Sequence, residues 1–124
     1  MSIQIYEPST IGLSEKAHTI LTKLKEDGYF AEMLDGYRFG ISLALSKNVI
    51  PDEISGSKQT TFNIGSLDSD KSIYKAIKLL LDTKDIPVYR WAERLAEWGV
   101  LELGEKAESG DIDFSEIINQ SQDS

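Results

Sequence analysis

The chain has 124 residues, no cysteine and a formal net charge of -8 at pH 7. A single domain of this length can bury a core without help from disulfides or metal ions, and the lack of cysteine excludes disulfides, thiolate metal sites and catalytic thiols. No apolar run is long enough to cross a membrane, and the opening MSIQIYEPS lacks the basic and apolar regions of a signal peptide. We therefore expect a soluble, cytoplasmic protein with no membrane partner.

Charge is distributed unevenly along the chain. Residues 105–124 contain one lysine and six acidic residues, a net charge of -5, whereas residues 1–104 contain twelve basic and fifteen acidic residues, a net charge of -3. DNA-binding domains usually present a basic face, so this balance gives weak support to a DNA partner. The pattern predicts one domain over residues 1–104 and a flexible acidic tail over residues 105–124.

Two helices are predicted in the first half of the chain. In LSEKAHTILTKLKEDG, Ser14 is a suitable N-cap, Ala17, Ile20, Leu21 and Leu24 form one apolar stripe, and Gly28 can end the helix. A second helix is expected from about Phe30 to Lys47, with an inward stripe of Met33, Leu34, Tyr37, Ile41, Ala44 and Leu45. The short link between them favours a tight hairpin or crossing.

A small β element is predicted in the middle of the chain. Residues 49–59 are rich in turn-forming residues and are expected to be a loop, whereas TTFNIGS at residues 60–66 favours an extended strand. The alternating IQIYEP at residues 3–8 is a suitable partner for this strand.

Two further helices are predicted in the second half. One begins near Asp70, with Ile73, Ile77, Leu80 and Leu81 on its inner face, and the other runs from Pro87 through Trp98 and ends or bends at Gly99. The sequence therefore predicts a mostly α fold, namely a compact four-helix domain with a small β element.

Motifs typical of catalysis or metal binding are absent from the sequence. GSLDSDKS at residues 65–72 precedes a helix, where phosphates or cations can bind, but it matches neither a Walker loop nor a calcium loop, so we interpret its polar residues as helix caps. His18 is the only histidine and has no cysteine or second histidine to complete a zinc site, so we expect it at a solvated or half-buried helix position. We predict no enzyme activity, no cofactor and no metal; a metal-dependent hydrolase is the least favoured alternative.

The segment YRWAERLAEWG places Trp91 and Trp98 on one side of a helix, next to Arg90 and Arg94. Aromatic and arginine side chains in this arrangement can stack the bases of a single-stranded nucleic acid. The same pattern is typical of a buried helix face flanked by ion pairs, which we favour, and of an oligomer contact.

Arg38 follows Tyr37 within the otherwise apolar segment YRFGISLALSK. Its stem can lie along the helix surface while its head reaches water. It can also pair with Asp35 or Glu32 across a subunit contact, or contact a phosphate or guanine. We adopt the subunit contact as a hypothesis. The candidate interface or DNA-contact residues are Tyr37, Arg38, Arg90, Trp91, Arg94 and Trp98.

Four segments, LSEKAHTILTKLK, YRFGISLAL, TTFNIGSL and RLAEWGVLELG, together resemble the small E component of the DNA phosphorothioation (DNA sulfur modification) family, DndE. The resemblance covers about residues 10–104 and implies a helical, ribbon-helix-helix-like fold, assembly into oligomers, and a role in DNA modification and binding. The chain departs from that family in lacking an evident lysine cluster. The leading hypothesis is a noncatalytic, oligomeric accessory or DNA-associated protein of a bacterial DNA-modification or defence system. The alternative is an acidic inhibitor or DNA mimic that binds a nucleic-acid enzyme.

Overall fold

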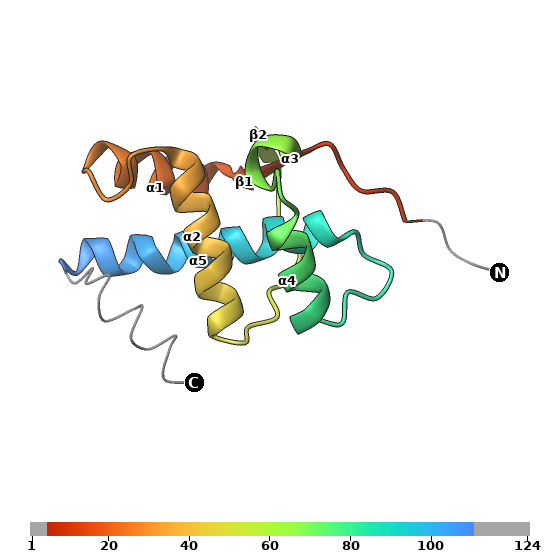
Figure 1. Ribbon diagram of the computed structural model, residues 1–124. Coiled ribbons are helices and arrows are strands. Elements are labelled where there is room, and N and C mark those ends of the chain that lie inside the picture. The colour runs from red at the N-terminus through yellow and green to blue at the C-terminus, as the bar shows by residue number, and fades with distance from the viewer. Residues whose placement is uncertain (1–4, 111–124) are drawn as a thin grey trace.

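The computed structural model describes residues 5–110. Within this range the chain forms five helices and two strands (Figure 1). In chain order they are β1 (Thr10–Ser14), α1 (Glu15–Glu26), α2 (Met33–Ser46), β2 (Lys58–Asn63), α3 (Ile64–Leu67), α4 (Ser72–Leu80) and α5 (Val88–Glu108). The fold is thus a small, predominantly helical domain with a two-stranded antiparallel sheet, and no described helix is long and apolar enough to span a membrane.

Helix α5 is the central element, and α1, α2, α4 and β1 all pack against it (Figure 1). Its buried face combines small and large residues: Trp91, Ala92, Leu95, Ala96, Gly99, Val100 and Leu103. The predicted end of this helix at Gly99 was wrong, because α5 continues to Glu108. Gly99 instead lies where α2 crosses, and a Cβ atom there would collide with the backbone of Gly40.

The helix continues through residues 105–108 of the expected tail, and residues 111–124 lie outside the described part of the chain.

The sheet pairs β1 with β2, from Thr10 opposite Asn63 to Ser14 opposite Lys58, with a register irregularity between Ile11 and Gly12. The predicted pairing of residues 3–8 was wrong. Residues 5–8 have no regular structure, and residues 3 and 4 are not among those described. The physical reason is burial, since β1 places Ile11 and Leu13 in the core whereas Ile5 and Tyr6 are exposed.

The second strand begins earlier than expected and is followed by a helix. Residues 64–66, predicted to continue the strand, form most of the short helix α3, which buries Leu67. The four predicted helices are therefore five. In α4, Ile77 is buried and Ile73 and Leu81 are half-buried, but the expected inward position of Leu80 was wrong, because 61% of this residue is exposed.

The capping interpretation of residues 65–72 is confirmed. The Asp68 carboxylate accepts hydrogen bonds from the backbone N–H groups of Ile73 and Tyr74, both at 2.9 Å. Asp70 accepts the Ser72 N–H at 3.0 Å, and this hydrogen bond lowers the pKa of Asp70.

The two predicted N-terminal helices are present with shifted bounds. Ser14 caps α1 by accepting the Ala17 N–H at 3.1 Å, and Gly28 follows the helix with a φ of 85°. Helix α2 begins at Met33 rather than Phe30, because Glu32 caps it. His18 is half-buried on α1, as expected.

Candidate functional site

The six candidate residues come from two helices that pack against each other, α2 and α5. Tyr37 is fully buried on α2, where its hydroxyl donates to the carbonyl oxygen of Gly12 at 3.0 Å. Arg38, the next residue, binds α3: its Nε donates to the Leu67 carbonyl oxygen at 3.0 Å, and Nη2 donates to that of Ser66 at 2.8 Å. The guanidinium that prompted the subunit hypothesis thus has partners within its own chain.

The other candidate residues lie on α5. Trp91 is a core residue, 5% exposed, and its indole N–H donates to the Thr83 carbonyl oxygen at 3.1 Å. The Arg94 guanidinium carbon lies 4.8 Å from the centre of the Trp91 ring, so Arg94 covers the indole. Trp98 is only half-buried.

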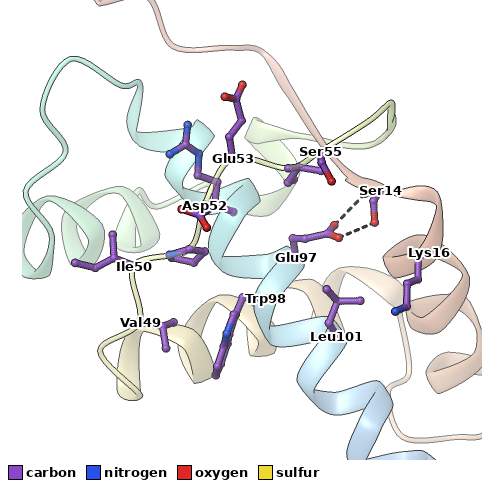
Figure 2. Close-up of a pocket in the computed structure, with 13 residues that line it drawn as sticks. Ser14, Lys16, Val49, Ile50, Asp52, Glu53, Ser55, Glu97, Trp98 and Leu101 are labelled. Atoms are coloured by element: carbon purple, nitrogen blue, oxygen red, sulfur yellow. Dashed lines mark hydrogen bonds between the residues drawn. The ribbon is translucent and has the colours of Figure 1, made fainter.

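Arg94 and Trp98 line a cleft of about 750 Å³ between α5 and the loop that follows α2 (Figure 2). Apolar side chains come from both sides: Val49, Ile50, Pro51 and Ile54 from the loop, and Trp98 and Leu101 from α5. Figure 2 shows Trp98 between Val49 and Leu101. The charged lining residues are of both signs, namely Lys16, Asp52, Glu53, Arg94 and Glu97.

Two further hollows share lining residues with the cleft, one towards the start of α5 and one along α1. A hollow of about 330 Å³ shares Glu53, Ile54 and Arg94 with the cleft and continues to Pro87 and Arg90. Another of about 650 Å³ shares Ser14, Lys16 and Ser55 with the cleft and continues to Glu108. Because a helix rises 1.5 Å per residue, the part of α5 from Pro87 to Leu101 that lines the groove formed by the cleft and the first hollow is roughly 20 Å long, enough for an extended peptide of about six residues.

Glu97 fixes the contact between α5 and the N-cap of α1 at this cleft. Its carboxylate accepts the Ser14 backbone N–H at 2.9 Å and the Ser14 hydroxyl at 2.6 Å (Figure 2). Ser14 in turn caps α1, so the Glu97–Ser14 pair joins α5 to the start of α1. Lys16, in the first turn of α1, is thereby placed at the same cleft as Trp98.

Glu93, one turn before Glu97, is 3% exposed. It accepts the Gly12 N–H at 2.9 Å and forms ion pairs with Arg90 at 2.7 Å and Lys58 at 3.0 Å. Burial, with Glu93 and Glu97 nearby, raises the pKa of Tyr37 well above its ordinary value. The ion pairs hold Arg90 and Lys58 along the wall of the groove.

Sequence reasoning identified Arg90, Arg94 and Trp98 but missed the opposite wall of the cleft. Residues 49–57 form neither helix nor strand, and their place against α5 depends on tertiary contacts. Of the ion pairs expected beside this helix face, Arg90 with Glu93 is present at 2.7 Å, whereas the hydrogen bonds of Glu93 and Glu97 to β1 were not predicted, because they depend on tertiary contacts. Among residues 5–110, no group of three or more histidine or acidic side chains could hold a metal ion.

In comparisons with known proteins, no family model, no curated protein and no solved structure matches the chain.

Proposed function

We propose that the protein is a noncatalytic accessory protein that binds a segment of a partner protein in the groove along α5. The observation that carries the proposal is the composition of the cleft, in which apolar residues from two elements lie between charged residues of both signs. The resemblance to DndE suggests the setting, a bacterial DNA-modification or defence system.

The mixed charge of the cleft favours a protein partner over a nucleic acid. A DNA backbone in the cleft would meet Arg94 and Lys16 but also Asp52, Glu53 and Glu97, and its phosphates would be repelled by the three acidic groups. A peptide can place carboxylates near Lys16 and Arg94 and apolar side chains over Trp98 and Leu101. Tryptophan and arginine at the centre of a contact commonly dominate its binding energy.

A noncatalytic role agrees with how the least exposed carboxylates are used. Asp68, Glu93 and Glu97 each accept a backbone N–H of a neighbouring element. Glu7 does the same at the start of α5, accepting the N–H groups of Val88 and Tyr89, both at 2.9 Å. These acids stabilise the starts of helices and the edge of β1, so their carboxylates are engaged in the fold.

Affinity purification from the native host tests this function. Tagged wild-type protein is compared with an Ile50→Asp/Arg94→Glu variant, and retained fold is checked by circular dichroism. Ile50 is 72% exposed, whereas Arg94 is half-buried with its guanidinium over the Trp91 ring, so the fold check is made on the double variant and on each single variant. The matched control is Lys23→Glu, an exposed position on α1 outside the cleft.

We expect the wild type and the control to retain the same DNA-processing protein, identified by mass spectrometry, and the cleft variant to lose it. The purified chain should not bind a short DNA duplex. Duplex binding that weakens with salt and is lost in the cleft variant would contradict the choice of a protein partner.

A further inference from the structure

Helix α4 presents a surface of lysines and leucines, which we call the α4 surface: Lys71, Lys75, Lys78, Leu79 and Leu80. The three lysines are exposed; Lys75 and Lys78 share one side of α4, and Lys71 is the residue immediately before the helix. Leu79 is 84% exposed and Leu80 61%. None of these five residues lines the α5 cleft, so this surface is separate from the site of the proposed function.

The lysines of the α4 surface are available to a partner. Within residues 5–110 none of the three forms an ion pair. Asp70 and Asp82 flank the surface, and each accepts a backbone N–H, from Ser72 and Lys84 respectively. A complementary ligand would combine carboxylates for the lysines with apolar side chains for the two leucines.

The chain itself carries a segment of this chemistry. Residues 111–118, DIDFSEII, lie outside the described range and contain three acidic and four apolar residues. Their formal charge of -3 equals in size the +3 of Lys71, Lys75 and Lys78. Charge and apolar content therefore both match the α4 surface.

The length of α5 prevents the first half of this segment from reaching the α4 surface of its own molecule. Helix α4 packs at the start of α5, where the rings of Tyr74 and Tyr89 lie 5.6 Å apart, whereas Gly110 follows the opposite end (Figure 1). Tyr89 and Ser109 are separated by about 30 Å along the helix. A fully extended chain carries Phe114 no more than about 14 Å from Gly110. Ile112 and Phe114 can therefore reach an α4 surface only on another copy.

We propose that residues 111–118 of one copy bind the α4 surface of a second copy. Because the two surfaces in contact differ, the contact is head-to-tail, and repetition of it closes a ring or extends a chain of subunits. This inference concerns self-association and does not depend on what the α5 cleft binds.

Sedimentation velocity of the full chain over a dilution series tests the proposal, with three variants of matched size. The first variant reverses the charge of two lysines of the α4 surface (Lys75→Glu/Lys78→Glu). The second reverses the charge of two acids in the segment (Asp113→Lys/Glu116→Lys). The control reverses the charge of two exposed lysines on α1 (Lys23→Glu/Lys25→Glu). Wild type and control should associate as concentration rises, whereas each of the first two variants alone should associate about tenfold or more weakly. An equimolar mixture of those two should recover association, since each then meets opposite charge on the other molecule.

Other outcomes would overturn the proposal. A wild-type chain that stays monomeric at all concentrations would exclude the contact. If charge reversal on the α4 surface abolishes association and charge reversal in residues 111–118 does not, the α4 surface contacts a different part of the second copy. A mixture that remains monomeric would show that the two sites do not bind each other. A Leu79→Ser variant that associates like the wild type would remove the apolar half of the contact.

Discussion

The Glu93 carboxylate accepts the backbone N–H of Gly12 at 2.9 Å, so a helix side chain satisfies the N–H of a strand residue. Glu97 repeats the contact two residues further along β1, at Ser14, also at 2.9 Å. Side chains from α5 thereby take the place that a third strand would have at the edge of this small sheet. The same helix that lines the candidate cleft also supports β1.

Replacement of Glu93 should test this relationship directly. Glu93→Ala leaves the buried Gly12 N–H without its acceptor, and we expect a loss of about 1–3 kcal/mol in the free energy of unfolding. Glu93→Gln should cost less, because its amide oxygen can still accept that N–H and because Arg90 and Lys58 are partly exposed to water. Urea unfolding measures both, with Glu26→Ala on exposed α1 surface as the control. Equal losses for the two Glu93 variants would argue against the Gly12 bond as the main contribution.

The crossing of α2 and α5 should not tolerate a methyl group at Gly99. A Cβ atom there would collide with the Gly40 backbone, so the two helices would have to separate. We expect Gly99→Ala to lower the unfolding free energy by about 1–3 kcal/mol, the usual cost of overpacking. Gly65→Ala in α3 is the matched control, because a Cβ atom at that position would extend into open space. A Gly99→Ala protein as stable as the Gly65→Ala protein would contradict this explanation of the crossing.

Helical periodicity located most of the core correctly. In the predicted inward stripe of α2, Tyr37, Ile41 and Ala44 are buried and the other three residues are half-buried, because spacing along a helix alone fixes which residues share a face. The end of α5 was missed because glycine commonly ends helices, whereas Gly99 here allows the backbone of another helix to approach. Local sequence does not distinguish these two uses.

The candidate site was less predictable than the core. Arg94 and Trp98 stood out by residue type, but the cleft exists only because residues 49–55 return to α5 from a distant part of the sequence. Arg38 shows the same limit, because its hydrogen-bond acceptors are main-chain carbonyl groups of Ser66 and Leu67. Every residue has such a carbonyl, so no side-chain pattern identifies the partner.

Arg38→Ala should destabilise the domain without changing its assembly. The guanidinium donates two hydrogen bonds to α3, and its partial exposure reduces their contribution, so we expect a loss of about 1 kcal/mol. Arg38→Lys should recover only part of it, since an ammonium group cannot make the same two-point contact. Thermal unfolding measures the loss, and sedimentation measures assembly. Dissociation of an Arg38→Ala oligomer on dilution, with unfolding unaffected, would instead support a subunit contact at this residue.

Alkaline pH should weaken the fold through two buried tyrosines. Burial and the nearby Glu93 and Glu97 raise the pKa of Tyr37, and burial and the hydrogen bond to Asp68 raise the pKa of Tyr89. Unfolded tyrosine ionises near pH 10, so this stabilisation is complete below about pH 10 and is lost as the pH rises through the higher folded-state pKa values. Urea unfolding from neutral to alkaline pH should show the decline.

The Tyr37→Phe/Tyr89→Phe variant is the comparison for that decline, because both rings remain and both ionisations are removed. Its free energy of unfolding should be about 1 kcal/mol lower per hydroxyl at neutral pH and should decline less steeply above pH 10. If the two proteins decline in parallel, other groups cause the alkaline dependence.

Site-specific photocrosslinking in the native host tests the proposed function most directly. A photoreactive amino acid at position 50 lies on the rim of the cleft, at a residue that is 72% exposed, and one at position 23 on α1 serves as the control. We predict that position 50, and not position 23, forms a discrete covalent product with a DNA-processing protein, and that Arg94→Glu reduces its yield. Crosslinking at position 50 to DNA alone, or to nothing beyond what position 23 captures, would contradict the assignment of this cleft as a protein-binding site.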